Sequence, residues 1–225
     1  MRRRLSLVLQ LFLLPLPWGV RRRLLVILCG YEIDATARIG LSLVAPDRLV
    51  MRQDSRIGHL TLARGLAAIR LEKGAALGHL NWISGFPREG ERYFRAFPAR
   101  DPSLVIGEHG AIVHRNLIDC TDRVSIGAFA LVAGNRNQIL THSIDLATGN
   151  QACAPVTVGR HCFVGTGTIL LKGSVLPDCC VLAAGSVLNA AHTAPYRLLS
   201  GVPAAAVRDL APDLAFFHRT RGESD

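Results

Sequence analysis

Six large aliphatic residues recur at an interval of six in the C-terminal half of the chain. They are Val158, Val164, Leu170, Leu176, Leu182 and Leu188. Neither an α-helix nor an ordinary strand has this period, since their side chains repeat about every 3.6 and every 2 residues. The pattern instead predicts a coil of short strands and tight corners, with three strands in each turn. Residues 18 apart should then stack at the strand spacing of roughly 4.8 Å, with the aliphatic residues inside.

This repeat resembles that of the hexapeptide-repeat acyltransferases, whose fold is a left-handed parallel β-helix. The segments Ala194-Pro195-Tyr196 and Leu199–Ala204 are similar to those that follow the last coil in the sugar O-acetyltransferase branch. The resemblance covers roughly residues 33–209 and implies an all-β hexapeptide-repeat solenoid. We expect an N-terminal helical segment over residues 1–30, the β-helix over 31–209 and a C-terminal tail over 210–225.

Two stretches interrupt the repeat and are expected to leave the coil. Residues 84–103 contain three prolines, mixed charge and four aromatic residues, and residues 135–155 contain His142. Long ordered loops on rigid repeats often have a functional role. The first loop is therefore expected to line an acceptor pocket or to contact a neighbouring subunit, with a surface flap of no chemical role as the alternative.

The first thirty residues have a different composition from the coil. Two arginine clusters, Arg2–Arg4 and Arg21–Arg23, flank an apolar run that Pro15 and Pro17 interrupt. The run is short for a membrane span and lacks a clear small-residue cleavage site, which argues against a signal peptide. We expect interfacial helices that bind an anionic membrane, helices that cover the open end of the coil, or both.

Composition limits the partners and the compartment. The formal net charge is +9 and the sequence pI is about 10.0, which favours an anionic partner. The basic residues are not interleaved with aromatic residues, so nucleic acid is not expected, whereas the phosphates of coenzyme A fit the charge. None of the six cysteines forms a Cys-x-x-Cys pair, so a zinc ribbon is excluded and reduced core thiols in the cytoplasm are expected.

The resemblance also implies the catalytic residues. In that family a histidine about one coil before the regular hexads is the general base, and His142 occupies this place. An imidazole suits the task, because acetyl transfer from a thioester to a hydroxyl needs a group that removes the hydroxyl proton near neutral pH. Asp145 or a backbone carbonyl is expected to hold the other ring nitrogen. Asn116 lies near a family position that contacts the acceptor.

The same resemblance implies how the donor is bound. The family lays the pantetheine arm of acetyl-CoA along the outside of the coil, between two subunits. Four positions of this chain match that site: Phe163, Thr166, Ala184 and Arg208. Phe163 stands where many members have tryptophan. Two common phosphate partners are absent, since alanine stands at positions 190 and 205, so Arg208, Lys172, Arg160 or Arg197 would compensate.

Together these features predict an acetyl-CoA-dependent O-acetyltransferase acting on a sugar hydroxyl, in cell-surface polysaccharide or glycolipid biosynthesis. We expect direct transfer without an acyl-enzyme, no metal ion and a homotrimer. The expected location is the cytoplasm, with peripheral attachment to the inner face of the plasma membrane as an option. Two alternatives stay open: a noncatalytic membrane-associated scaffold, and a zinc hydratase of the γ-type carbonic anhydrase kind that uses His79, His109 and His114.

Overall fold

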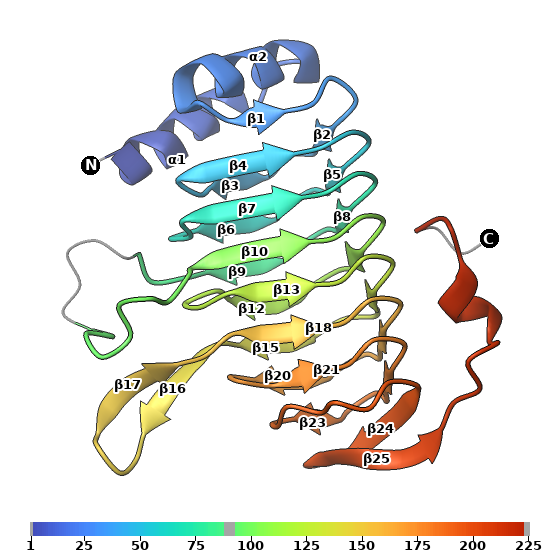
Figure 1. Cartoon of the computed structure of the whole chain (residues 1–225). Coiled ribbons are helices and arrows are strands. Elements are labelled where there is room, and N and C mark those ends of the chain that lie inside the picture. Colours follow the sequence, from blue (N-terminus) through green and yellow to red (C-terminus); the bar gives the residue numbers. More distant parts are fainter. Residues whose placement is uncertain (1, 88–92, 223–225) are drawn as a thin grey trace.

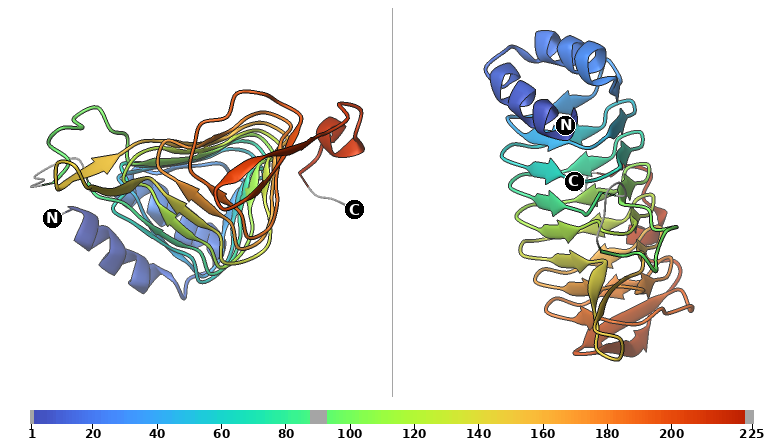
Figure 2. Two further views of the ribbon diagram at one scale, coloured as in Figure 1. Left: turned by 90° about the horizontal axis from the view of Figure 1, so that it is seen from below. Right: turned by 90° about the vertical axis from the view of Figure 1, so that its left-hand side faces the viewer.

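The computed structural model describes residues 2–87 and 93–222, and its main body is a parallel β-helix built from three sheets (Figure 1). Residues 88–92 of the first predicted loop and 223–225 of the predicted tail lie outside the described residues. Consecutive strands of a coil belong to different sheets. Viewed along its axis the coil has a triangular outline (Figure 2). The corners of this triangle position the candidate site.

The first face, sheet A, contains seven parallel strands. In spatial order they are β1 (Glu32–Ile33), β4 (Arg48–Met51), β7 (Ala68–Leu71), β10 (Ser103–Ile106), β13 (Val124–Ile126), β18 (Val156–Val158) and β21 (Val175–Leu176).

The second face, sheet B, contains nine strands. They are β2 (Arg38–Ile39), β5 (Arg56–Ile57), β8 (Ala76–Leu77), β11 (Ala111–Ile112), β14 (Leu131–Val132), β19 (Phe163–Val164), β22 (Val181–Leu182), β24 (Arg197–Gly201) and β25 (Ala204–Asp209). The last two form an antiparallel hairpin that extends an otherwise parallel sheet.

The third face, sheet C, contains seven strands. They are β3 (Leu43–Ala45), β6 (Leu62–Arg64), β9 (Trp82–Ser84), β12 (Leu117–Asp119), β15 (Gln138–Leu140), β20 (Ile169–Leu171) and β23 (Val187–Leu188).

The core follows from the hexad. All six hexad residues are buried, each at most 1% exposed. The register is also the expected one in this region, since Phe163 pairs with Val181, 18 residues later. Earlier coils are longer: Arg48 pairs with Ala68. The small residues form a buried ladder at the corner between sheets B and C, in which Asn81, Asn116, Asn137 and Thr168 hydrogen-bond from coil to coil.

Two helices close the N-terminal end of the coil (Figure 1). Helix α1 (Arg2–Leu13) ends before Pro15, and α2 (Trp18–Cys29) begins directly after Pro17, as expected from the missing N–H of proline. Gly30 ends α2 in the left-handed conformation, with its N–H donated to the Val26 carbonyl at 3.1 Å. No helix among the described residues is long and apolar enough to span a bilayer.

Polar side chains of these helices hydrogen-bond the first strands of all three sheets. Gln10 exchanges two hydrogen bonds with the backbone of Val44 in β3. Arg21 donates to the carbonyls of Ile39 and Gly40 at the end of β2, and Arg22 donates to the carbonyl of Ile33 in β1. Leu13 and Leu25 are buried in the core. The helices therefore satisfy backbone groups that an open sheet edge would leave unpaired.

Both interruptions of the coil occur at the corner between sheets C and A. Residues 85–102 leave the coil between β9 and β10. The second interruption is shorter than predicted, because β15 keeps residues 138–140 in sheet C, where the buried Ile139 belongs to the core. Only residues 141–155 leave the coil, as an antiparallel hairpin of β16 (His142–Asp145) and β17 (Asn150–Cys153). Figure 1 shows this hairpin and the green loop on the same side of the coil.

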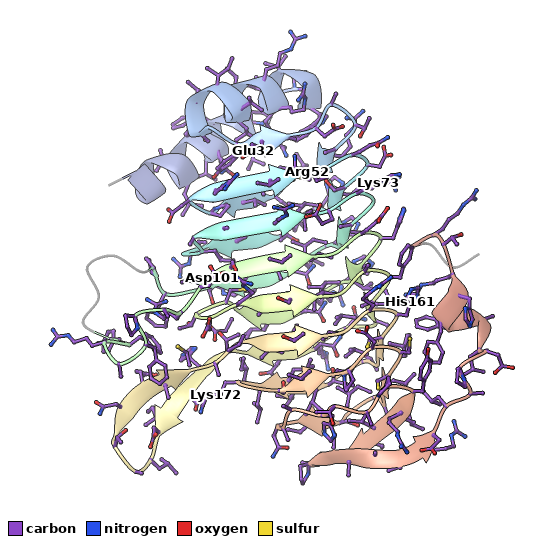
Figure 3. All side chains as sticks on the ribbon, viewed as in Figure 1. Glu32, Arg52, Lys73, Asp101, His161 and Lys172 are labelled. Carbon is purple, nitrogen blue, oxygen red and sulfur yellow. The ribbon has the colours of Figure 1, made fainter. Side chains whose placement is uncertain are left out.

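The tail returns along the opposite side of the molecule. It contains the short helix η1 (Ala215–His218), in which the ring of Phe216 packs edge-on against Phe163 of β19 at 5.8 Å. Arg219 then donates to the carbonyl of Phe129. Figure 3 labels Asp101 near the loop side and His161 near the tail side, on opposite edges of the coil.

Candidate active site

His142 is the first residue of the outward hairpin, directly after the coil strand β15. Its neighbour Thr141 is fully buried and still belongs to the corner of the coil, whereas the His142 side chain is 30% exposed. The register pairs His142 with Cys153 across the hairpin. The imidazole is therefore held by the rigid corner and remains accessible to a substrate.

Asp119 holds one ring nitrogen of His142. This aspartate ends β12, one coil before His142, and its side chain is only 7% exposed. Its Oδ2 lies 2.6 Å from His142 Nδ1. A carboxylate can only accept, so Nδ1 carries the proton and donates it. The opposite nitrogen, Nε2, is then free to accept a proton, as a general base requires.

Four further donors fix the Asp119 carboxylate. Its Oδ1 accepts from the N–H and hydroxyl of Thr121, at 3.1 and 2.6 Å, and its Oδ2 accepts from the N–H and hydroxyl of Thr141, at 2.9 and 2.8 Å. Burial alone would raise the pKa of Asp119, but hydrogen bonds from His142, Thr121 and Thr141 outweigh it and hold the pKa below its usual value. Asp119 is therefore an ionised and oriented partner for the imidazole.

Two aromatic rings from the first loop stand edge-on to the imidazole. The ring centroids of Phe86 and Phe94 lie 5.5 and 5.8 Å from that of His142, at interplanar angles of 82° and 87°. Phe94 is buried, whereas Phe86 is 38% exposed. These rings limit the approach of water to one side of the histidine and leave an apolar wall beside it.

The buried Arg100 attaches this aromatic wall to the coil. Its guanidinium donates to the carbonyls of Phe86 and Pro87 in the loop, and to that of Thr121 beside Asp119. Its Cζ also lies 5.1 Å from the centre of the Phe94 ring. Arg100 thus connects the loop to the corner that positions the carboxylate.

Two predicted site residues are placed elsewhere. Asp145 does not contact His142: its Oδ1 accepts from the N–H groups of Ala147 and Thr148 and shapes the hairpin turn. Asn116 is 2% exposed, and its side chain is used inside the coil, where its Nδ2 donates to Asn81 and its Oδ1 accepts from the N–H of Asn137. Asn116 therefore cannot reach an acceptor, and Asp119 takes the place predicted for Asp145.

The sequence contained a signal for Asp119 that the prediction did not use. Asp119 directly follows the buried hexad residue Ile118, and two threonines flank the pair that it forms with His142. An acidic residue at the end of a coil strand, one coil before the candidate base, is expected to lie beside that base. Thr121 and Thr141 were also missed, and only their hydrogen bonds to Asp119 identify them.

The cysteines near the site are poor nucleophiles. Cys153, opposite His142, has its pKa raised to about 11 chiefly by burial. Burial also raises the pKa of Cys120, next to Asp119, well above its usual value. Because the thiolate is the reactive form, neither thiol is suited to hold an acyl group.

The four positions matched to donor binding lie on sheet B and its corner with sheet C. Phe163, Val181, Leu198 and Arg208 form one cross-strand row on neighbouring strands of sheet B. Phe163 is half-buried and Arg208 is exposed. Thr166 and Ala184 are exposed at the adjoining corner. Within one chain these four residues are on different faces and corners from His142, so the chain does not bring the two sets together.

The row has the chemistry that a CoA-type molecule needs. Val181 and Leu198, between the aromatic Phe163 and the cationic Arg208, are half-buried. An apolar strip can contact a pantetheine arm, and an arginine can bind phosphate. The tail already contacts the Phe163 end of this row through Phe216.

The three histidines of the zinc alternative do not converge. His79 and His114 stack at the corner between sheets B and C, with centroids 5.0 Å apart, and each Nδ1 accepts a backbone N–H. His109 lies at the corner between sheets A and B, stacked on Phe129. In the described part of the chain, no group of three or more His, Cys, Asp or Glu side chains is arranged to hold a metal ion. The geometry therefore argues against a zinc hydratase.

Comparison with known proteins gives a clear result for the fold. No family model matches the chain, and no curated protein matches it in sequence. A solved polysialic acid O-acetyltransferase is 16% identical, covers 80% of this chain and 84% of its own, and has a TM-score of 0.58.

A hexapeptide-repeat acetyltransferase from Vibrio cholerae, solved with acetyl coenzyme A, is 21% identical. It covers 63% of this chain and 71% of its own, with a TM-score of 0.51. A further structure of a Vibrio cholerae acetyltransferase of this type covers 93% of this chain and 90% of its own, at 18% identity and a TM-score of 0.50. The predicted left-handed parallel β-helix is thus confirmed, and the chain shares its fold with hexapeptide-repeat acetyltransferases of known structure.

Proposed function

We propose that this protein is an acetyl-CoA-dependent O-acetyltransferase that acts on a sugar hydroxyl, with His142 as its general base. The observation that supports this most directly is the 2.6 Å contact between His142 Nδ1 and the buried Asp119 carboxylate. A partly exposed imidazole fixed in this way has one task open to it, proton transfer at Nε2. The fold agrees, since the polysialic acid and Vibrio cholerae proteins with this fold are acetyltransferases.

The chemistry is a direct transfer. The acceptor hydroxyl oxygen attacks the thioester carbonyl carbon while Nε2 of His142 takes the hydroxyl proton. The tetrahedral adduct then collapses, the carbon–sulfur bond breaks, and the imidazolium returns the proton to the departing thiolate. Asp119 stabilises the imidazolium between these steps. The products are an acetyl ester and the free thiol of CoA, and the histidine is again neutral.

The donor belongs on sheet B, along the row from Phe163 to Arg208, with its phosphates near the arginine. This row and His142 are on different parts of the triangular outline, so a site within one chain is incomplete. We therefore propose a homotrimer in which His142 of one subunit faces the row of the next. Thr166 and Ala184, at the corner beside the row, would contact the pantetheine arm, and the cytoplasm supplies the acetyl-CoA.

The test is acetyl transfer from acetyl-CoA to a panel of sugars and nucleotide sugars, measured as CoA release and as ester formation by mass spectrometry. Wild-type protein should acetylate at least one acceptor, and His142→Ala should reduce turnover by about 10²-fold to 10⁴-fold. The KM for acetyl-CoA should stay near its wild-type value, because the base contacts the acceptor and not the donor phosphates. Full turnover by His142→Ala would reject the assignment.

A further inference from the structure

The two N-terminal helices expose a large apolar face on the side turned away from the coil. In α1 the exposed residues Val8, Leu11 and Phe12 are spaced i, i+3 and i+4, so they share one face. The opposite side of α1 contains Gln10 and Leu13, which contact the coil. Phe12 is 76% exposed, which is unusual for so large an apolar side chain.

Helix α2 repeats the arrangement. Val20, Arg23 and Ile27 are spaced i, i+3 and i+7 on its exposed side, and Ile27 is 75% exposed. Arg21 and Leu25 on the other side are buried against the coil. The name helical cap is used below for the exposed residues of both helices: Val8, Leu11, Phe12, Val20, Arg23, Ile27 and Leu28.

Charge indicates what this face contacts. The first thirty residues contain six arginines and no aspartate or glutamate. Apolar side chains combined with arginines alone match a surface that is anionic outside and apolar within, which describes a bilayer with acidic lipids. Neither helix is long enough to cross a bilayer, so the helices would lie in the interface.

We propose that the helical cap docks the protein on an anionic lipid surface. Figures 1 and 2 show the helices at one end of the coil, with the hairpin that begins at His142 further along it. In sheet C, β15 is four strands from β3 at the capped end. At roughly 4.8 Å per strand, His142 then lies about 19 Å beyond the capped edge. Building on the proposed function, this height suits a glycan hydroxyl that extends from a membrane lipid.

Binding to vesicles tests the docking independently of catalysis. The full-length protein should sediment with phosphatidylcholine vesicles that contain phosphatidylglycerol and not with pure phosphatidylcholine, and salt should weaken this binding. Phe12→Ser and Ile27→Ser should each lower the partition coefficient by about tenfold, as expected for one large apolar side chain. Arg23→Gln should lower it by about fivefold. The matched controls Leu60→Ser and Val202→Ser, exposed residues elsewhere on the molecule, should bind as the wild type does.

The two tryptophans test the orientation. Trp18 begins α2, whereas Trp82 lies in β9, two strands from β3 in sheet C. Brominated lipids should quench the Trp82→Phe protein, which keeps Trp18, and should not quench the Trp18→Phe protein. Equal quenching of both would overturn the orientation.

Two results would overturn the docking itself. One is wild-type protein that ignores anionic vesicles. The other is a Phe12→Ser and Ile27→Ser double variant that loses an oligomer in light scattering with no change in vesicle binding, since the face would then contact a second copy. If vesicle binding holds but no sugar is acetylated, the proposed function fails and the docking survives.

Discussion

Replacing Asp119 with asparagine tests the central contact of the site. The two oxygens of Asp119 accept two backbone N–H groups, two hydroxyls and His142 Nδ1, whereas an asparagine offers only one oxygen. If its NH₂ replaces Oδ2, Nδ1 has to accept, and the proton moves to Nε2, which blocks the base. If the NH₂ replaces Oδ1, the Thr121 N–H loses its acceptor and the imidazolium still loses its counter-charge.

Both orientations predict a large loss of activity with a modest loss of stability. We expect kcat to fall by about 10²-fold to 10⁴-fold and the free energy of unfolding to fall by roughly 1–3 kcal/mol, because one buried N–H group loses its acceptor. The assay is the initial rate of CoA release at saturating substrates, with urea unfolding followed by circular dichroism.

Asp145→Asn is the matched control, since this carboxylate lies in the same hairpin but only shapes its turn. It should leave kcat close to the wild-type value. A folded Asp119→Asn protein with wild-type kcat, or an Asp145→Asn protein that loses as much activity, would refute the reasoning.

Three more results are expected. Arg208→Ala should raise the KM for acetyl-CoA with little change in kcat, because a phosphate contact is made equally in the ground and transition states; steady-state kinetics will show it, and an unchanged KM would move the phosphate site elsewhere. Cys153→Ser should keep most of its turnover, and loss of an acetylated-enzyme mass together with activity would contradict direct transfer. Burial, then His79 and Arg115, lower the pKa of His114, so its neutral form stabilises the fold above about pH 6.5 and this stability is lost as the pH falls. Melting temperatures between pH 7 and 5 should therefore fall less in His114→Asn than in the wild type.

The sequence predicted the coil well where its turns are regular. In the last coils each turn has 18 residues, so the register of Phe163 with Val181 follows from counting. The buried, unpaired thiols of Cys162 and Cys180 agree with this register. Hexad spacing determines which side chains fill the interior, and that information is local.

The contact between Asp119 and His142 could not be counted in the same way. The turn that joins Leu117 to Gln138 has 21 residues, and the earlier one that joins Trp82 to Leu117 has 35 because of the loop. Which residues stack across such turns depends on where the chain leaves the coil. The sequence therefore identified His142 as a base but assigned its partner to Asp145, its neighbour along the chain, instead of Asp119, its neighbour across the coil.

The helical cap also determines how this molecule stays separate from its copies. Gln10, Arg21 and Arg22 each hydrogen-bond the first strand of a different sheet or the residue that ends it. Without the helices, the first coil would present three unpaired strands whose spacing matches the end of any other such coil. Chains shortened at the N-terminus would then be able to stack end to end and grow into fibrils. The arginines and the glutamine thus act as a chain terminator for an otherwise repeating polymer.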